Sequence, residues 1–356
     1  MSEQQQRGVV EPYEGAKAEA MLRGYDARWG GEALTVLAVE AEFRAPVVNP
    51  ATGAASRTWG LGGKIDAIVR EEATGRVLVV EHKTSSDDIT PGSEYLRRLR
   101  MDGQVSIYFD GAAALGHTPD ACLYDVLGKP GLRPSQVPVL DEQGVKIVLD
   151  AAGVRVRTKD GKKFRETGDT ASGYVLQTRV ETVEEYYGRV ASSIAMDPNG
   201  YYVRAEVVRL DGELDDARFD VWQIGAQLRE AANAGRHPRN PDACSRWGRT
   251  CEFFDVCTGA GSVDDPTRFR VETAAHAELA ADATDALPLL TASRLTCARA
   301  CQRMHKLRYL DGVRPAIEAE ALRFGTLIHR GLEAWWKAQG DDRLPAALAA
   351  IYAPTV

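Results

Sequence analysis

The sequence predicts an α/β protein in which a mixed central β-sheet is flanked by helices. Its 356 residues can form one large domain or two ordinary ones, and 44% hydrophobic with 27% charged residues is typical of a globular protein. Two β-rich runs, 64–70 and 76–82, flank a glycine-containing turn and predict a hairpin. Around this hairpin the patterns follow the order helix, three strands, helix, strand, which indicates a layered α/β core.

The elements of this core lie in the first third of the chain. Apolar residues at helical spacing predict a helix at 14–29. A strand at 34–47 precedes the hairpin, and 71–75 forms the hairpin turn. A helix at 91–115 and a buried strand at 120–128 complete the order.

The remainder of the chain is less regular. A polar, turn-rich stretch at 129–173 predicts an inserted, partly ordered arm. We expect helices at 174–193 and 214–234, a strand at 201–210, and a further helix that contains 324–333.

Composition narrows the class of protein. The net charge of −7 argues against a generally basic nucleic-acid-binding surface, but not against a local basic groove. We interpret the Lys/Arg clusters at 97–100, 159–165 and 299–308 as solvated faces. No long apolar run and no apolar leader are present, so we expect a cytoplasmic protein with no membrane contact. Clustered cysteines in such a protein indicate metal or redox chemistry.

Chemistry-bearing side chains stand at the paired ends of the hairpin strands. Asp66 lies near the start of the first strand, and Glu81 and Lys83 at the end of the second. Antiparallel pairing brings these ends together, and residues two apart point to the same face. Two carboxylates can hold Mg²⁺ or Mn²⁺, which activates water and neutralises charge on a phosphate. A solvated hairpin with an ordinary Glu–Lys pair is the alternative interpretation.

Two other groups of residues stand out. Gln104 and Tyr108 are four residues apart, on one face of the predicted helix at 91–115. Three of the six cysteines lie close together at Cys244, Cys251 and Cys257, with spacings that fit a Cys-x2–4-Cys zinc site poorly. Zinc and unliganded thiols remain alternatives for these three. Cys122, within the strand at 120–128, is expected in the core.

The sequence Gly-x-x-Asp, then Glu-x-Lys, then Gln-x-x-x-Tyr resembles the RecB-like branch of the PD-(D/E)XK nuclease superfamily. This resemblance implies a restriction-endonuclease-like core with an iron–sulfur subdomain. It implies that Asp66, Glu81 and the backbone carbonyl of His82 bind Mg²⁺ or Mn²⁺, while Lys83 positions water and stabilises charge. The implied catalytic residues are Asp66, Glu81, Lys83, Gln104 and Tyr108.

The same resemblance, closest to phage, CRISPR-associated and AddB-type nucleases, implies a [4Fe–4S] cluster bound by three cysteines after the core and a fourth before it. Here the motifs Ser-x-Leu, Cys-x-Arg and Gly-x-x-x-His follow the core instead. The fourth cysteine is then Cys301 rather than Cys297, because Cys301 precedes the basic–aromatic run at 303–309. The third metal ligand is His329, and Gly325 before it allows its helix to approach another backbone closely.

This motif order differs from the usual one in the family. A circular permutation, natural or engineered, is favoured over a segment-swapped dimer or a truncated second copy. A helix end at 345–352 would then lead towards the helix at 14–29. The implied regions are 13–130 for the nuclease core, 131–243 for the arm and helices, 244–257 for the cysteine cluster, 258–289 for a linker, and 290–356 for the segment that completes the core.

The predicted function is metal-dependent hydrolysis of DNA phosphodiester bonds, and the resemblance implies an exonuclease acting on single-stranded ends. The resemblance implies a role in phage or bacterial recombination, repair or CRISPR-type processing, with DNA and partner proteins of that process as partners. We expect a monomer or a segment-swapped dimer. Two alternatives remain: a DNA-binding accessory module with little turnover, and a nuclease for RNA or another phosphodiester.

Overall fold

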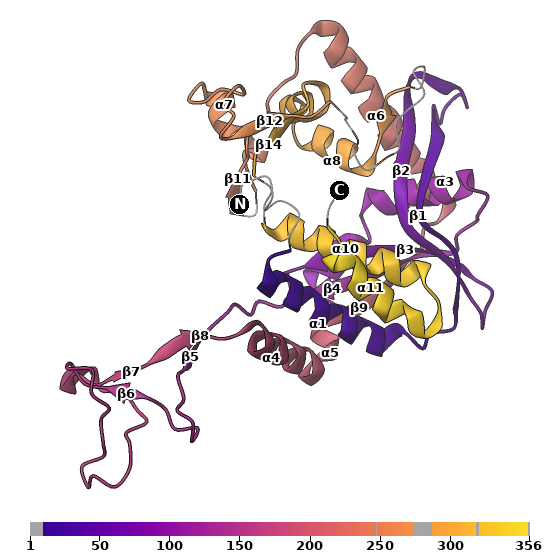
Figure 1. Cartoon of the computed structure of the whole chain (residues 1–356). Helices are drawn as coiled ribbons and strands as arrows, with labels where there is room; N and C mark the ends of the chain where they lie inside the picture. Colours follow the sequence, from indigo (N-terminus) through magenta and orange to yellow (C-terminus); the bar gives the residue numbers. More distant parts are fainter. Residues whose placement is uncertain are drawn as a thin grey trace.

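A mixed six-stranded sheet forms the centre of the molecule (Figure 1). The computed structural model describes residues 10–246, 248–273, 276, 279, 287–317 and 320–354. The strand order is β1-β2-β3-β4-β9, with β13 beside β2; the β3–β4 and β2–β13 pairs are parallel and the others antiparallel. The strands are β1 (Leu34–Val48), β2 (Ala55–Glu71), β3 (Val77–Ser85), β4 (Ala121–Gly128), β9 (Tyr202–Val207) and β13 (Leu289–Leu290).

Helices cover both faces of this sheet, as the sequence predicted. One face packs against α1 (Pro12–Trp29), α4 (Val183–Met196), α10 (Glu320–Lys337) and α11 (Arg343–Tyr352). The other face packs against α3 (Gly103–Ala114), α6 (Asp211–Ala234) and α8 (Ala292–Ala300). Alternate residues of a strand point to opposite faces, so Leu78 and Val80 of β3 enter the first core and Val79 enters the second.

The predicted hairpin is present, with Arg70 of β2 opposite Val77 of β3. The first helix, the first strand and the strand of Cys122 also lie where they were predicted, and Cys122 is fully buried. β2 begins earlier than expected, at Ala55, because it continues to pair with β1 as far as Val48.

The helix predicted at 91–115 is in fact two helices, α2 (Glu94–Leu99) and α3. The break falls at Asp102, whose carboxylate caps α3 by accepting a hydrogen bond from the Gln104 backbone at 3.0 Å. The other oxygen of this carboxylate accepts from the Tyr124 hydroxyl at 2.7 Å. A tertiary contact therefore holds the cap in place.

The helix predicted at 174–193 begins only at Val183. Thr182 and Glu185 form a reciprocal capping box there, which defines the helix start. The residues before it belong to the arm, which consists of the two-stranded ladders β5 (Gln136–Pro138) with β8 (Thr178–Val180) and β6 (Val148–Leu149) with β7 (Val175–Leu176). The arm, which includes a 3-10 turn at Thr170–Ser172, projects from the body of the molecule (Figure 1). The strand predicted at 201–210 is shorter, as β9, and follows the short α5 (Pro198–Tyr201).

A small module packs beside the main sheet around a separate cluster of Phe253, Phe269, Leu307 and Val313. Its elements are the 3-10 turn Pro241–Ala243, β10 (Ser245–Arg246), β11 (Arg249–Thr250), α7 (Phe254–Thr258), β12 (Phe269–Val271), α9 (Gln302–His305), a π-helical turn at Lys306–Leu310, and β14 (Val313–Pro315). β12 pairs with β14, so the first part of the linker predicted at 258–289 belongs to this module. Residues 280–286 of that linker, and Trp247 within the cysteine cluster, lie outside the described residues.

The 3-10 helix Gly340–Asp342 connects α10 with α11, the last helix of the chain. The hydroxyl of Tyr352, at the end of α11, donates to Glu19 of α1 at 3.0 Å, so the last helix packs against the first. Among the described helices, none combines the length and the apolar character needed to cross a membrane.

Candidate active site

Two carboxylates lie at the predicted site, Glu81 buried and Asp66 partly exposed. Asp66 Oδ2 accepts a hydrogen bond from the backbone N–H of His82 at 2.8 Å, which ties β2 to the end of β3. Glu81 is 4% exposed, and its Oε2 atom is buried with no hydrogen-bond partner among the described residues. Burial, and then the charge of Glu81, raise the pKa of Asp66 to about 8. Ionising both carboxylates therefore costs free energy, through desolvation and mutual repulsion, and a bound cation would offset this cost.

A chain of polar side chains starts at Lys83, on the same face of β3 as Glu81. Its Nζ lies 2.5 Å from Glu81 Oε1 and donates to Gln104 Oε1 at 2.7 Å. The amide of Gln104 donates in turn to the Tyr108 hydroxyl at 2.7 Å. Burial lowers the pKa of Lys83, but Glu81 outweighs it and raises the value to about 12. Strand alternation pairs Glu81 with Lys83 and the four-residue spacing pairs Gln104 with Tyr108, and the packing of α3 on the sheet joins the two pairs.

The side chain of His82 points to the opposite face of the sheet. There its Nδ1 lies 3.4 Å from Asp125 Oδ2 on the parallel neighbour β4. Asp125 also accepts hydrogen bonds from Tyr25 at 2.5 Å and from Arg204 at 3.1 Å. The His82 ring also lies 6.3 Å from the ring of His329, while the backbone N–H of His82 contacts Asp66 at the site. The group around Asp125 was not predicted, because nothing in the sequence shows that β4 lies next to β3.

The C-terminal helix α10 brings His329 to the same place. His329 Nδ1 lies 3.9 Å from Asp66 Oδ2 within one chain. Burial, followed by the charge of His82, lowers the pKa of His329 to about 4, so the imidazole is neutral and can act as a ligand. One turn earlier, a Cβ on Gly325 would lie 3.3 Å from Thr84 Oγ1. The missing side chain therefore lets α10 lie against the end of β3. The close approach was predicted to be to another backbone, but it is to the side chain of Thr84.

These residues fit a divalent cation in their chemistry. Such ions take oxygen and nitrogen donors. The site offers the carboxylate oxygens of Asp66 and Glu81, including the Glu81 oxygen that lacks a hydrogen-bond partner, and the neutral imidazole of His329. In the described part of the chain, no three His, Cys, Asp or Glu side chains are yet gathered closely enough to hold a metal. Lys83 pairs with one Glu81 oxygen, and the His82 N–H donates to Asp66 Oδ2.

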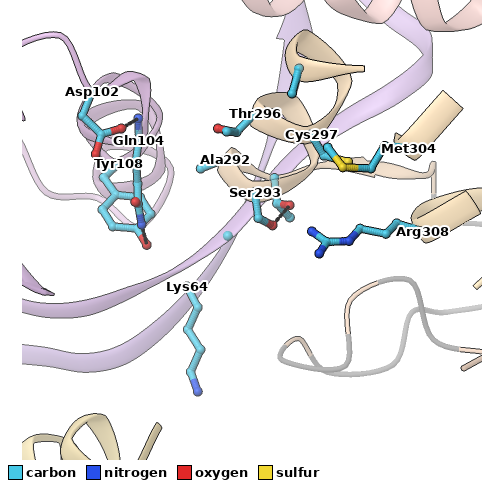
Figure 2. Close-up of a pocket in the computed structure, with 13 residues that line it drawn as sticks. Lys64, Asp102, Gln104, Tyr108, Ala292, Ser293, Thr296, Cys297, Met304 and Arg308 are labelled. Carbon is cyan, nitrogen blue, oxygen red and sulfur yellow. Dashed lines mark hydrogen bonds between the residues drawn. The ribbon is translucent and has the colours of Figure 1, made fainter. Parts of the chain in front are cut away.

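A cavity of about 450 Å³ opens next to this site (Figure 2). Gln104 and Tyr108 line one side from α3, and Ser293 and Thr296 line the other from α8. Lys64 of β2 and Arg308 also contribute to its walls. Lys64 and Thr296 were not singled out from the sequence, because only the fold brings α8 opposite α3, whereas Ser293 is the serine of the Ser-x-Leu motif.

The four cysteines proposed for a cluster lie on two segments that contact each other. The Asn240 side chain donates to the Ala300 carbonyl at 2.9 Å, and Arg308 pairs with Glu252 at 2.6 Å. Burial raises the pKa of Cys257, and the nearby thiols of Cys301 and Cys244 add to this rise. Cys297 instead lines the cavity described above. The donor set suits a thiolate-bound group, but among the described residues the thiols do not converge into a closed site.

Comparison with known proteins gives one family. A family model described as the PD-(D/E)XK nuclease superfamily matches residues 2–258 and 289–354. No curated protein matches the sequence. A solved structure titled "Crystal structure of SSO0001" is similar at 13% identity over 55% of this chain and 81% of that one, with a TM-score of 0.19, which is too low to support an argument.

Proposed function

The chain belongs to the PD-(D/E)XK nuclease superfamily, and from this premise we propose that it is a metal-dependent DNA exonuclease acting on single-stranded ends. The observation that carries the proposal is the meeting of Asp66, Glu81, Lys83 and His329 at the end of β3. The proposed setting is phage or bacterial recombination, repair or CRISPR-type processing, with partner proteins of that process. This setting rests on the RecB-like resemblance of the motifs.

Each residue of the site has a role that its contacts support. Asp66, Glu81, His329 and the carbonyl of His82 would hold Mg²⁺ or Mn²⁺, which when bound supplies an activated water and neutralises charge at the phosphate. Lys83, as an ammonium between Glu81 and Gln104, orients the water and stabilises charge that develops on phosphate oxygens. Gln104 fixes the position of Lys83, and Tyr108 fixes the position of Gln104.

The cavity beside the site supports the assignment of the substrate. Hydroxyl groups of Ser293 and Thr296 and the guanidinium of Arg308 are donors suited to the phosphates of a DNA strand. The end of the strand would lie between α3 and α8, with the phosphate to be cleaved beside Lys83. Gln104 and Tyr108 belong to both the cavity and the polar chain, so they connect strand binding with the catalytic lysine.

We expect the purified protein to shorten a labelled linear single-stranded DNA with Mg²⁺ or Mn²⁺, and EDTA to stop the reaction. Lys83→Ala should lower the rate by about 10²-fold, the usual effect of removing one charge-stabilising donor. Lys337→Ala, an exposed lysine on α10, is the control and should keep full activity. Gel analysis of 5′- and 3′-labelled strands measures the rate.

Circular single-stranded DNA and RNA of the same sequence complete this test. Cleavage of the circle would show an endonuclease, and preferential cleavage of RNA would favour the RNA alternative. Metal-dependent DNA binding with no turnover on any substrate would favour the accessory module. Full activity of the Lys83 variant would show that the site is wrongly assigned.

The unusual motif order fits a circularly permuted domain that completes its site within one chain. The contact of His329 with Asp66 and the packing of α11 on α1 support this order. A segment-swapped dimer is not needed to bring His329 to the carboxylates. The regions 290–356 and 13–130 would then form one nuclease domain, although they stand at opposite ends of the chain.

A [4Fe–4S] cluster bound by Cys244, Cys251, Cys257 and Cys301 is also part of the proposal. Its role would be structural, joining the two segments that the Asn240–Ala300 and Arg308–Glu252 contacts already bring together.

Protein purified without oxygen is expected to be brown, with broad visible absorption, and Cys251→Ser should bleach it. Cys122→Ala, in the core of the sheet, should leave the colour unchanged. Cys301→Ser and Cys297→Ser separate the two candidates for the fourth ligand, because only the ligand's loss bleaches the protein. A colourless protein with stoichiometric zinc would contradict the iron–sulfur assignment.

A further inference from the structure

The projecting arm leaves the fold at the end of β4, beside the end of β3, the strand that carries Glu81 and Lys83. Gly128, the last residue of β4, pairs with Ser85, the last residue of β3. The backbone N–H of Lys129 then donates to the Ser85 carbonyl at 2.7 Å, immediately before the arm begins. Glu81 and Lys83 stand on the same strand a few residues earlier. A DNA strand that left the site past the end of β3 would therefore pass close to the base of the arm.

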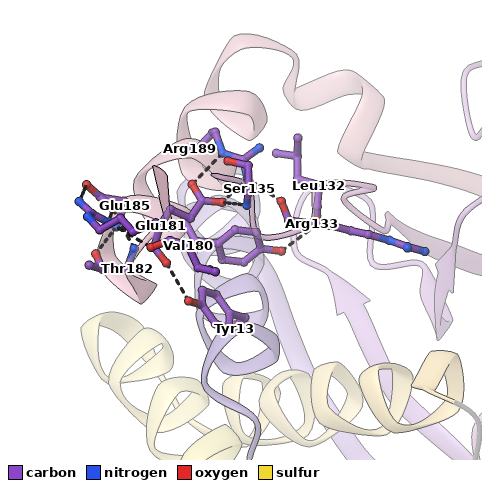
Figure 3. Close-up of polar contacts among 11 residues, drawn as sticks. Tyr13, Leu132, Arg133, Ser135, Val180, Glu181, Thr182, Glu185 and Arg189 are labelled. Carbon is purple, nitrogen blue, oxygen red and sulfur yellow. Dashed lines mark hydrogen bonds and ion pairs between the residues drawn. The ribbon is translucent and has the colours of Figure 1, made fainter. Parts of the chain in front are cut away.

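The base of the arm is held by a buried acidic residue, Glu181 (Figure 3). Its side chain is almost fully buried and accepts hydrogen bonds from Arg189 at 3.1 Å and from the Ser135 backbone at 2.8 Å. The Tyr13 hydroxyl donates to the Glu181 carbonyl at 2.7 Å, and Arg189 also donates to the Arg133 carbonyl at 2.7 Å. Both ends of the arm are thereby tied to α1 and α4. The direction in which the arm projects is set by these contacts.

Part of the arm is basic, although the whole chain has a net charge of −7. Residues 155–165 hold six lysines and arginines and one carboxylate, Asp160. Arg155 and Arg165 pair with Asp141 and Asp169 elsewhere in the arm. That carboxylate accepts hydrogen bonds from Thr158 and from the Lys162 backbone. Lys159, Lys162 and Lys163 are exposed and form no ion pair with any residue that the structure describes. Their charge is therefore available to a ligand.

Arginine side chains lie over the two aromatic rings of the arm, Phe164 and Tyr174, and would compete with bases for them. The guanidinium groups of Arg155 and Arg157 lie 3.9 Å and 4.5 Å from the ring centre of Phe164. Arg165 lies 5.1 Å from the ring centre of Tyr174. Binding of a single strand normally uses exposed aromatic side chains as stacking surfaces. Exposed lysines without such surfaces instead suit the regularly spaced phosphates of a duplex.

We propose that the arm binds the phosphate backbone of duplex DNA adjoining the single-stranded end held at the active site. A two-stranded β-ribbon is also narrow enough to enter the major groove of a duplex. The proposal rests on the proposed function for the position of the DNA end, and it makes the substrate a duplex with a single-stranded tail. Lys159, Lys162 and Lys163 are the residues expected to contact phosphates.

The test compares a variant with Lys159→Gln, Lys162→Gln and Lys163→Gln with a control that removes the same charge elsewhere. The control carries Arg23→Gln, Arg236→Gln and Lys337→Gln, all exposed side chains outside the arm. Affinity for a tailed duplex and for the tail alone is measured by fluorescence anisotropy at several salt concentrations. EDTA is present, so that no strand is cut.

The arm variant should bind the tailed duplex about tenfold more weakly or worse, and its log–log salt slope should fall by up to about 3, since each lost phosphate contact removes about 0.9. Its affinity for the tail alone, and its cleavage of a short single strand, should equal those of the wild type. The control should match the wild type throughout.

Unchanged duplex affinity and salt slope would overturn the proposal and leave the arm as a surface for a protein partner. An equal loss on the tail and on the duplex would also overturn it, because the arm would then bind single strands. The binding measurement does not require turnover. If the wild type cut no substrate but the arm variant still bound the duplex more weakly than the wild type, the proposed function would be contradicted and the role of the arm would not.

Discussion

Asp66→Asn is expected to abolish metal-dependent cleavage while leaving the metal-free protein more stable than the wild type. The substitution keeps an oxygen that can accept from the His82 N–H, which Asp66 Oδ2 now does at 2.8 Å. It removes one of two carboxylates that burial and mutual repulsion make costly, since the pKa of Asp66 is raised to about 8. Loss of a metal ligand should lower the rate by at least about 10³-fold, or roughly 4 kcal/mol of transition-state stabilisation.

The stability gain should depend on pH in a defined direction. A carboxyl group whose pKa is raised by folding destabilises the folded state increasingly as pH rises from its unfolded pKa towards its folded pKa. The Asn variant should therefore differ least from the wild type near pH 4 and most above pH 8. Thermal unfolding in EDTA across this range measures the difference.

The control for this experiment is Asp215→Asn, because Asp215 is exposed and pairs only with surface Arg218 among the described residues. It should change neither cleavage nor the pH dependence of stability. Full cleavage by the Asp66 variant, or a variant less stable than the wild type at pH 9, would show that Asp66 is not one of two opposed carboxylates in a metal site.

The parts of the site that could be predicted from the sequence follow from local geometry. Hairpin pairing and the two-residue repeat of a strand place Asp66, Glu81 and Lys83 together whatever the rest of the chain does. The helical spacing of Gln104 and Tyr108 likewise places them on one face. Contacts between these local units are different, because the hydrogen bond from Lys83 to Gln104 depends on how α3 packs on the sheet.

The features that were missed depend on partners distant in the sequence. Asp102 breaks the helix predicted at 91–115 because Tyr124, on β4, holds its carboxylate in place. Residues 175–180 form strands rather than helix because the other half of the arm pairs with them. His329 could be connected with the hairpin only through a family resemblance, since no local pattern relates α10 to β2.

The buried group behind the site provides the largest expected effect on stability. Asp125→Ala should destabilise the protein by about 3–5 kcal/mol, because removing one partner leaves the others buried without their countercharge. Asp125 is fully buried, and although burial raises its pKa, Arg204 and His82 together hold it well below the ordinary range. Arg204 keeps one partner, the partly exposed Glu32, so the lower end of the range is expected.

Asp125→Ala with Arg204→Met should be less destabilising than the sum of the single changes, because the double variant buries no uncompensated charge. Asp220→Ala, which removes an exposed aspartate paired with Arg299 at 3.1 Å, is the matched control and should cost at most about 1 kcal/mol. Urea unfolding at pH 7 measures all of them, with an unchanged m-value as the condition for comparison.

The wild type should also lose the contribution of Asp125 in acid. A lowered pKa stabilises the fold fully above the pKa of the unfolded state, and this stabilisation is lost as the pH falls towards the pKa of the folded state. If Asp125→Ala cost no more than Asp220→Ala, the Asp125 group would not be what holds the strand of Glu81 and Lys83 against its neighbours.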